Sequence, residues 1–216
     1  MTDNMGQVFR LVEIHTEIAG PGRGRKHNVE VLHKSAIVLL VAAWEAYVED
    51  IALHAAEFLA RNIGQPEHLP RNIQHAICEN LRESTGLKPW QIAGEGWRNV
   101  YLDRVKKRVD HFNAPTSDNI RDLFHTGLGM KDVTERWYWT KAPRRNVVRR
   151  LDRLIDRRQD ISHRVATAGP VNKKYVEHSI ELIRKLSAVC SNHVRRHVEE
   201  ITGDAPWAEY RAGAAK

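Results

Sequence analysis

Apolar residues recur at intervals of three and four along most of the chain, the spacing that gathers them on one face of an α-helix. The strongest such pattern covers about residues 29–62. Its central run, 37–43, is apolar nearly all round, so we expect this helix to be central and buried, and Gly64 and Pro66 end it. Its periodic apolar positions are Leu32, Ala36, Leu39, Leu40, Ala43, Tyr47, Ile51, Ala55, Phe58 and Leu59.

A second long pattern covers about residues 172–202, and Gly203 follows it in the place of a C-cap. Another helix is predicted over about 145–167, and Gly169 and Pro170 separate the two. Because the connection is short, we expect these last two helices to be antiparallel neighbours. The apolar positions in register on the last helix are Val176, Ile180, Ile183, Leu186, Cys190, Val194, Val198 and Ile201.

The rest of the chain predicts shorter helices and no convincing strand, with helical patterns at about residues 3–19, 69–84, 97–112 and 118–126. The predicted fold class is therefore all-α: a helical bundle with two long antiparallel helices and shorter helices in a middle insertion. We expect three parts, which are an N-terminal helix with a basic glycine-rich loop at 1–28, a helical domain at 29–203, and a C-terminal tail at 204–216.

Composition narrows the class of protein. The net charge is +7 and the isoelectric point is about 9.6, which favours a polyanionic partner such as RNA or DNA. The two cysteines, Cys78 and Cys190, form no CxxC motif and suit a reducing compartment. The N-terminus has no apolar signal core, and the longest apolar run, 36–44, is too short to cross a membrane. We therefore expect a cytoplasmic protein with no membrane partner.

The helix predicted over 145–167 carries the residues of greatest chemical interest. On a helical wheel with Ile155 at zero, Arg158 falls at about −60°, within the apolar stripe, and His163 at about +80°. A charge in that stripe must reach past it to solvent, pair with an acid, or lie in a polar cleft. A purely structural alternative is that Arg158 forms an ion pair with Glu45 on the buried helix. Gln159, at about +40°, lies between Arg158 and His163 and can orient either side chain.

Three other patterns suggest chemistry less specifically. Trp137, Tyr138 and Trp139 lie beside basic residues and can stack on bases, although such a triplet is more often a local core. Glu30 and His33 have the E-x-x-H spacing of di-iron bundles, but we find no second such motif. His193 and His197 could share a metal ion, but Arg195 and Arg196 would repel it. We expect no metal and no cofactor.

Three segments, in this order, resemble the HEPN superfamily and its RiboL-PSP-HEPN-like bacterial members. LHKSAIVLLVAAWEAYVEDIA, residues 32–52, resembles their apolar helix with an embedded Glu-Ala-Tyr. FNAPTSDNIRDLFHTGLGM, residues 112–130, resembles their proline-containing turn and short helix ending in glycines. LDRLIDRRQDISHR, residues 151–164, is similar to their signature of an arginine, a polar residue and a later histidine.

The resemblance implies a homodimer in which paired arginine–histidine motifs face each other and cleave RNA without a metal ion. Arg158 and His163 would be catalytic, Gln159 and Glu45 supporting, and Arg157 and Arg164 would bind RNA. A possible antitoxin or other protein partner is also implied, because such domains recur in RNA processing, toxin–antitoxin and phage-defence systems.

Two departures from the family pattern keep other functions open. Active members usually carry Asn, Asp or His after the arginine, where this chain has Gln159, and toxins controlled by nucleotidyltransferases carry a tyrosine where it has Val165. A catalytically inactive HEPN module that binds RNA or a protein is therefore the alternative. A helical adaptor without an RNA role would be favoured if Arg158 formed a buried ion pair.

Overall fold

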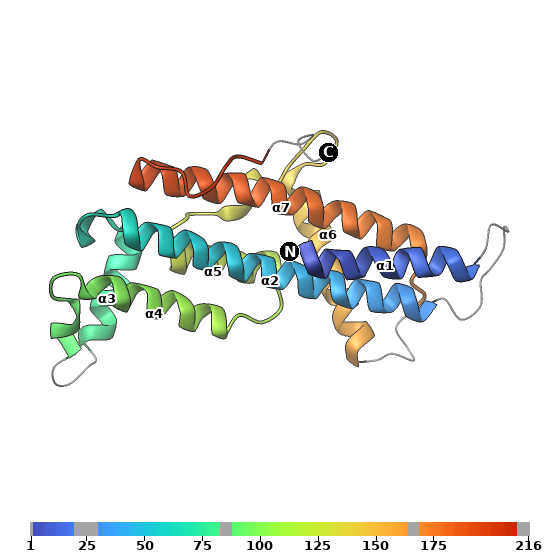
Figure 1. The fold of residues 1–216 in the computed structure, drawn as a ribbon, viewed down its shortest axis with the longest axis horizontal. Coiled ribbons are helices and arrows are strands. Elements are labelled where there is room, and N and C mark those ends of the chain that lie inside the picture. The colour runs from blue at the N-terminus through green and yellow to red at the C-terminus, as the bar shows by residue number, and fades with distance from the viewer. Residues whose placement is uncertain (1, 20–29, 83–87, 164–168, 211–216) are drawn as a thin grey trace. The chain divides into compact units, whose positions relative to one another are not determined.

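The computed structural model describes residues 2–19, 30–82, 88–163 and 169–210, and within them the chain is α-helical (Figure 1). Apart from one isolated bridge between Trp139 and Ala142, the described residues contain no β-structure. The all-α class is therefore confirmed. The α-helices are α1 (Thr2–Ala19), α2 (Glu30–Asn62), α3 (Arg71–Arg82), α4 (Gly96–Asp110), α5 (Ser117–Leu128), α6 (Arg144–His163) and α7 (Lys173–Thr202). Three short 3-10 segments are η1 (Pro66–His68), η2 (Lys88–Ile92) and η3 (Val133–Arg136).

The chain forms two compact units, each assembled from segments distant in sequence. The first comprises Met1–Tyr47, Ala114–Ser117 and Tyr138–Ser187, and the second comprises Val48–Asn113, Asp118–Trp137 and Ala188–Lys216. Helices α2 and α7 each begin in the first unit and end in the second. The predicted boundaries at residues 28 and 203 stay a prediction, and the glycine-rich loop and the last six residues lie outside the described residues.

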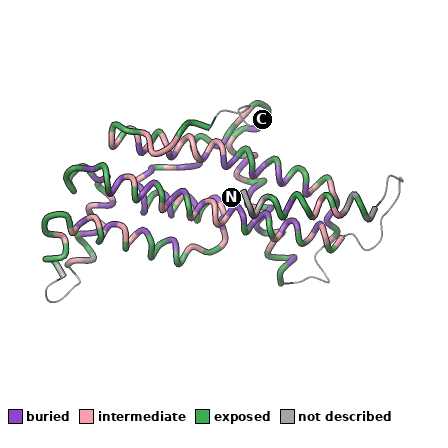
Figure 2. The backbone as a smooth tube through the Cα atoms, viewed as in Figure 1, coloured by how far each residue is buried: buried purple, intermediate pink, exposed green. Residues whose placement is uncertain are grey.

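Burial follows the predicted periodicity closely on α7 and less closely on α2 (Figure 2). Every apolar position predicted for α7 is buried except Ile201, which is half-buried. In α2, Ile37, Leu40 and Trp44 are fully buried, but Leu39 is 40% exposed. The expectation of burial all round this helix is therefore wrong at Leu39. In the described portion, no helix is both long and apolar enough to cross a membrane.

Hydrogen bonds in the first unit show the direction of the long helices. His33 Nδ1 donates to the carbonyl of Val171 at 2.9 Å, and the Tyr47 hydroxyl donates to that of Ser187 at 2.7 Å. Residue numbers thus rise together along both helices, so α2 and α7 run in the same direction there. The expected pair of long antiparallel helices is not confirmed for these two longest helices.

Helices α6 and α7 are neighbours in the first unit. Arg157 lies close enough to Tyr175 to act on the pKa of its hydroxyl, which burial raises and Arg157 lowers. The Glu181 carboxylate has its pKa lowered by its hydrogen bond from Lys185, and Arg150 adds to that effect. These electrostatic pairs proceed in opposite order along the two helices, from Arg157 and Tyr175 to Arg150 and Glu181.

Helix ends use glycine where the backbone requires it. Gly129 has φ +74° after α5, and its N–H donates to His125 while that of Met130 donates to Phe124, which satisfies two terminal carbonyls. A Cβ at Gly129 would lie 2.3 Å from the ring of Pro70, so both the positive φ and this close approach require glycine there. Gly203, at φ +81°, caps α7 as predicted, with its N–H donating to Glu199.

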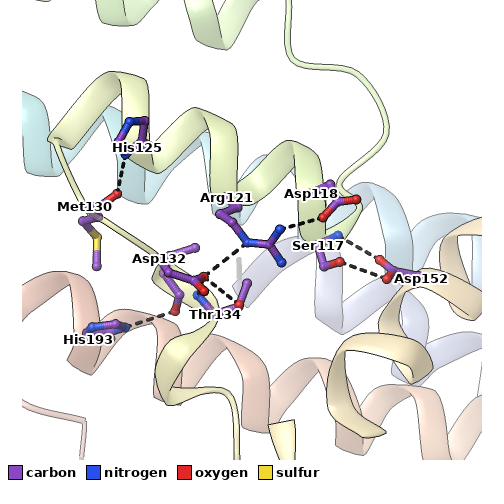
Figure 3. Close-up of polar contacts among 10 residues, drawn as sticks. Ser117, Asp118, Arg121, His125, Met130, Asp132, Thr134, Asp152 and His193 are labelled. Atoms are coloured by element: carbon purple, nitrogen blue, oxygen red, sulfur yellow. Dashed lines mark hydrogen bonds and ion pairs between the residues drawn. The ribbon is translucent and has the colours of Figure 1, made fainter. Parts of the chain in front are cut away.

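Asp152 of α6 fixes the turn before α5 within the first unit. One oxygen of its carboxylate accepts the backbone N–H of Ser117 at 2.8 Å, and the other accepts the Ser117 hydroxyl at 2.9 Å (Figure 3). Ser117 is buried, so both its donors need partners inside the protein. This pair of bonds ties α6 to a segment 35 residues earlier in the chain.

Two histidines join α7 to the 128–133 segment inside the second unit. His193 Nδ1 donates to the carbonyl of Val133 at 3.0 Å (Figure 3). His197 Nε2 donates to the carbonyl of Leu128 at 2.8 Å. Burial lowers the pKa of His193, and the guanidinium groups of Arg196 and Arg136 lower it further, against the raising effect of the Val133 bond. Each ring is thus engaged in packing α7.

Asp152→Ala should destabilise the protein by about 1–3 kcal/mol, because the buried N–H and hydroxyl of Ser117 would lose their acceptor. Urea denaturation followed by circular dichroism measures this difference. Asp156→Ala, on the same helix and exposed, is the matched control and should cost less than about 0.5 kcal/mol. Equal losses of unfolding free energy in the two variants would show that the bonds to Ser117 do not stabilise the protein.

Stability should fall on acidification through His193. The pKa of His193 is lowered in the folded state from its ordinary value of about 6.5, so the unfolded chain takes up its proton first. The stability contribution is therefore complete above about pH 6.5 and is lost as pH falls. His193→Asn keeps a donor near the Nδ1 position but does not titrate. The urea midpoints at pH 7.5 and pH 5.5 should differ less in His193→Asn than in the wild type. An equal difference in both proteins would show that His193 does not cause the loss of stability at low pH.

Candidate active site

All described members of the predicted site belong to the first unit, and α6 carries most of them. Arg158 and His163 are five residues apart on a regular helix, so their side chains leave it about 140° apart. His163 is the last residue of α6 and is exposed, as is Gln159. Glu45, on α2, is half-buried. Arg164 lies outside the described residues.

Arg158 combines partial burial with incomplete hydrogen bonding. It is half-buried within the apolar stripe that includes Leu151, Leu154 and Ile155, where the helical wheel places it. Its Nε is buried and has no hydrogen-bond partner. Within the described ranges no ion pair joins Arg158 to any carboxylate, Glu45 included. The ion pair that would have favoured a purely structural role is therefore not formed.

An unsatisfied buried N–H of a charged group costs free energy, and native proteins retain few of them. A guanidinium can bind an anion, because it offers donors in a fixed fork that matches phosphate oxygens. The imidazole of His163, exposed at the end of the same helix, can accept or donate a proton. The two side chains are thus candidates for an anion-binding group and a proton-transfer group.

Arg157 has a different environment from its neighbour. One terminal nitrogen, Nη2, donates to the carbonyl of Gly169 and, at 3.0 Å, to that of Pro170. These bonds hold the chain that leads into α7, so this side chain already has a structural task. The loop that Arg157 binds could not be foreseen from helix periodicity, which describes only the helix that carries the side chain.

The second unit contains a polar network that the sequence pattern does not indicate. Arg121 pairs with Asp118 at 2.8 Å and with Asp132 at 3.3 Å, and Asp132 also accepts the backbone N–H and the hydroxyl of Thr134 (Figure 3). An open hollow of about 340 Å³ beside it is lined by Asp118, Arg121, Asp122, His125 and Lys131. Positive and negative charges balance there, so the network stabilises the turn after α5 and selects no ligand.

The metal alternatives gain no support from the geometry. His193 and His197 each use a ring nitrogen on a backbone carbonyl, and His33 does the same with Val171. Over the described ranges, no three His, Cys, Asp or Glu side chains gather in a group that could hold a metal ion. Cys78 is exposed and Cys190 is buried, where burial raises the pKa of its thiol to about 12.

Comparison with known proteins places these residues in a family. A family model described as RiboL-PSP-HEPN matches residues 8–196, a range that includes Glu45, Arg158 and His163. No curated protein and no solved structure matches the chain. The matched range covers well over half of the 216 residues. The chain therefore belongs to the RiboL-PSP-HEPN family.

Proposed function

We propose that this protein is a metal-independent endoribonuclease in which Arg158 and His163 act on the scissile phosphate. The observation that carries the proposal is the buried, unpartnered Nε of Arg158 on the helix that ends in the exposed His163. Membership of the family supports it, since HEPN proteins are often ribonucleases. The proposed setting is RNA processing, toxin–antitoxin control or phage defence, with an antitoxin as a possible partner.

The proposed reaction uses the nucleophile that RNA carries. The 2′-oxygen attacks the adjacent phosphorus and its proton passes to a neutral imidazole. The bond from phosphorus to the 5′-oxygen breaks, and a protonated imidazole donates a proton to that oxygen. The guanidinium of Arg158 holds the phosphate and stabilises charge on the pentacoordinate phosphorus. The products are a 2′,3′-cyclic phosphate and a 5′-hydroxyl.

A homodimer would solve a geometric difficulty in this mechanism. One imidazole cannot act as acid and base in the same step, and Arg158 and His163 diverge by about 140° on their helix. Two motifs facing each other across a two-fold axis would supply two imidazoles and two guanidinium groups to one phosphate. We therefore propose that the dimer, with one shared site, is the active form.

The second candidate function is an RNA-binding or protein-binding module without catalysis. Gln159 favours it, because active relatives usually carry Asn, Asp or His at that place. Gln159 is exposed beside the buried face of α6, so its amide offers hydrogen bonds to a ligand but no proton transfer. Cleavage assays distinguish this candidate from the first.

Arg158→Ala and His163→Ala should each lower RNA cleavage in EDTA by at least about 100-fold, because each removes a group that acts in the transition state. Gel assays with mass spectrometry of the ends measure the rate and detect the cyclic phosphate. Arg184→Ala and His178→Ala, exposed on α7, are matched controls that should keep activity. Wild-type protein that cleaves no RNA of varied sequence, while binding it, would favour the non-catalytic module.

A shared site predicts a dosage effect in mixed dimers. When wild-type and His163→Ala chains are refolded together at 1:3, about one-sixteenth of dimers contain two wild-type chains. Activity per wild-type chain should then fall to about one quarter of that of pure wild type, since mixed dimers lack one imidazole. Unchanged activity per wild-type chain would show that each chain carries an independent site.

A further inference from the structure

Three exposed arginines follow one face of α6. Arg145, Arg149 and Arg153 are spaced by four residues, which places them about 6 Å apart along the axis and within an arc of about 80°. We call these three residues the arginine row. They belong to the first unit, as do Arg158 and His163.

The arginine row forms no ion pair within the described structure. Arg149 donates to the side-chain oxygen of Asn146 at 2.9 Å, a neutral acceptor. In the part of the chain that the structure describes, none of the three arginines pairs with a carboxylate. Some other exposed cations on this protein do form ion pairs, as Arg10 does with Glu13 and Glu17. A row of unpaired guanidinium groups is a surface for phosphates.

The arginine row is in register with the proposed catalytic histidine. His163 follows Arg145 by eighteen residues, which is about five complete helical turns, so the two occupy the same angular position. About 15 Å of helix separate Arg153 from His163. Two exposed carboxylates, Asp156 and Asp160, lie on the same arc within that interval. They would repel phosphates there and confine tight backbone contact to the row itself.

An exposed aromatic side chain lies before the other end of the helix. Trp137 is fully buried, and the Trp139 ring is half-buried with the ammonium of Lys185 5.7 Å from its centre. Tyr138, in contrast, is 51% exposed. Of the three aromatics that the sequence offers for stacking, Tyr138 is therefore the one whose ring is open to solvent. Aromatic rings combined with cations along a backbone track are typical of surfaces that bind single strands.

We propose that the arginine row and Tyr138 bind single-stranded RNA and lead it along α6 toward His163. This assignment rests on the proposed ribonuclease function for the identity of the polyanion. The guanidinium groups bind successive phosphates, and Tyr138 stacks on an unpaired base, which a duplex does not expose. Arginine side chains on one straight helix read no sequence, so affinity is set by charge and by strandedness.

The test uses His163→Ala protein, so that RNA stays intact, and a fluorescent 12-nucleotide single strand. Arg145→Gln, Arg149→Gln and Arg153→Gln together should lower the slope of log affinity against log salt by about 2, since each phosphate that a cation neutralises adds about 0.7 to that slope. The matched control changes Arg71, Lys106 and Lys107 to Gln, which removes the same charge from exposed positions of the second unit. Fluorescence anisotropy measures both. Equal slope changes in the two triple variants would overturn the proposal, since net charge alone would explain them.

Two further variants test strandedness and local charge. Tyr138→Ala should weaken single-strand binding roughly tenfold and leave binding of a 12-base-pair duplex unchanged. Asp156→Asn with Asp160→Asn should tighten single-strand binding, because the repulsion beyond the row is removed. Equal weakening of duplex and single-strand binding in the Tyr138 variant would overturn the stacking role.

These outcomes separate the two proposals. Suppose that Arg158→Ala and His163→Ala abolish cleavage while the triple variant of Arg145, Arg149 and Arg153 leaves the salt slope unchanged. The proposed ribonuclease function would then be supported, and the proposed RNA-binding role of the arginine row would be overturned. If wild-type protein cleaves no RNA but the triple variant changes the salt slope as predicted, the ribonuclease proposal would be overturned. The arginine row would then be supported as the RNA-binding surface of a non-catalytic module.

Discussion

The angular setting of α6 is the constraint on which the proposed chemistry depends. Asp152 accepts both donors of the buried Ser117, so the helix is held to the turn before α5 by two bonds from one carboxylate. A helix fixed at one angular position presents each of its residues to one environment. Leu151, Leu154 and Ile155 are buried, Arg158 is half-buried within that apolar stripe, and the arginine row is exposed.

Three kinds of arginine on this one helix illustrate how environment divides identical side chains. Arg157 is occupied by two backbone carbonyls and holds the entry into α7. Arg158 is half-buried with an unpartnered Nε and is the residue that we propose binds the phosphate. Arg145, Arg149 and Arg153 are exposed and pair with no carboxylate in the described structure, and we propose that they attract RNA without fixing its geometry. In the proposed mechanism, positioning of the phosphate and attraction of the RNA therefore fall to different arginines.

The histidines divide in the same way. His33, His193 and His197 are packed against the chain and donate to carbonyls, whereas His163 ends its helix exposed. Burial lowers the pKa of His193, which keeps it neutral and suited to a structural bond. The imidazole of His163 is exposed, which is why we assign the proposed chemistry to His163 and not to His193 and His197 on α7.

The sequence by itself determined what depends on local spacing. The seven helices begin and end within a few residues of their predicted bounds, and the wheel placed Arg158 on the apolar face and His163 off it, because both follow from 3.6 residues per turn. Family membership was readable from three ordered segments for the same reason, since motifs are local. Only the tertiary structure decided which groups meet: Asp152 with Ser117, Arg157 with the Gly169 carbonyl, and no pairing of Arg158 with Glu45. Tertiary packing also exposed Leu39 and Tyr138, buried Trp137, and ran α2 and α7 in one direction in the first unit. These outcomes depend on contacts between residues far apart in the chain, and the periodicity of a single helix carries no information about them.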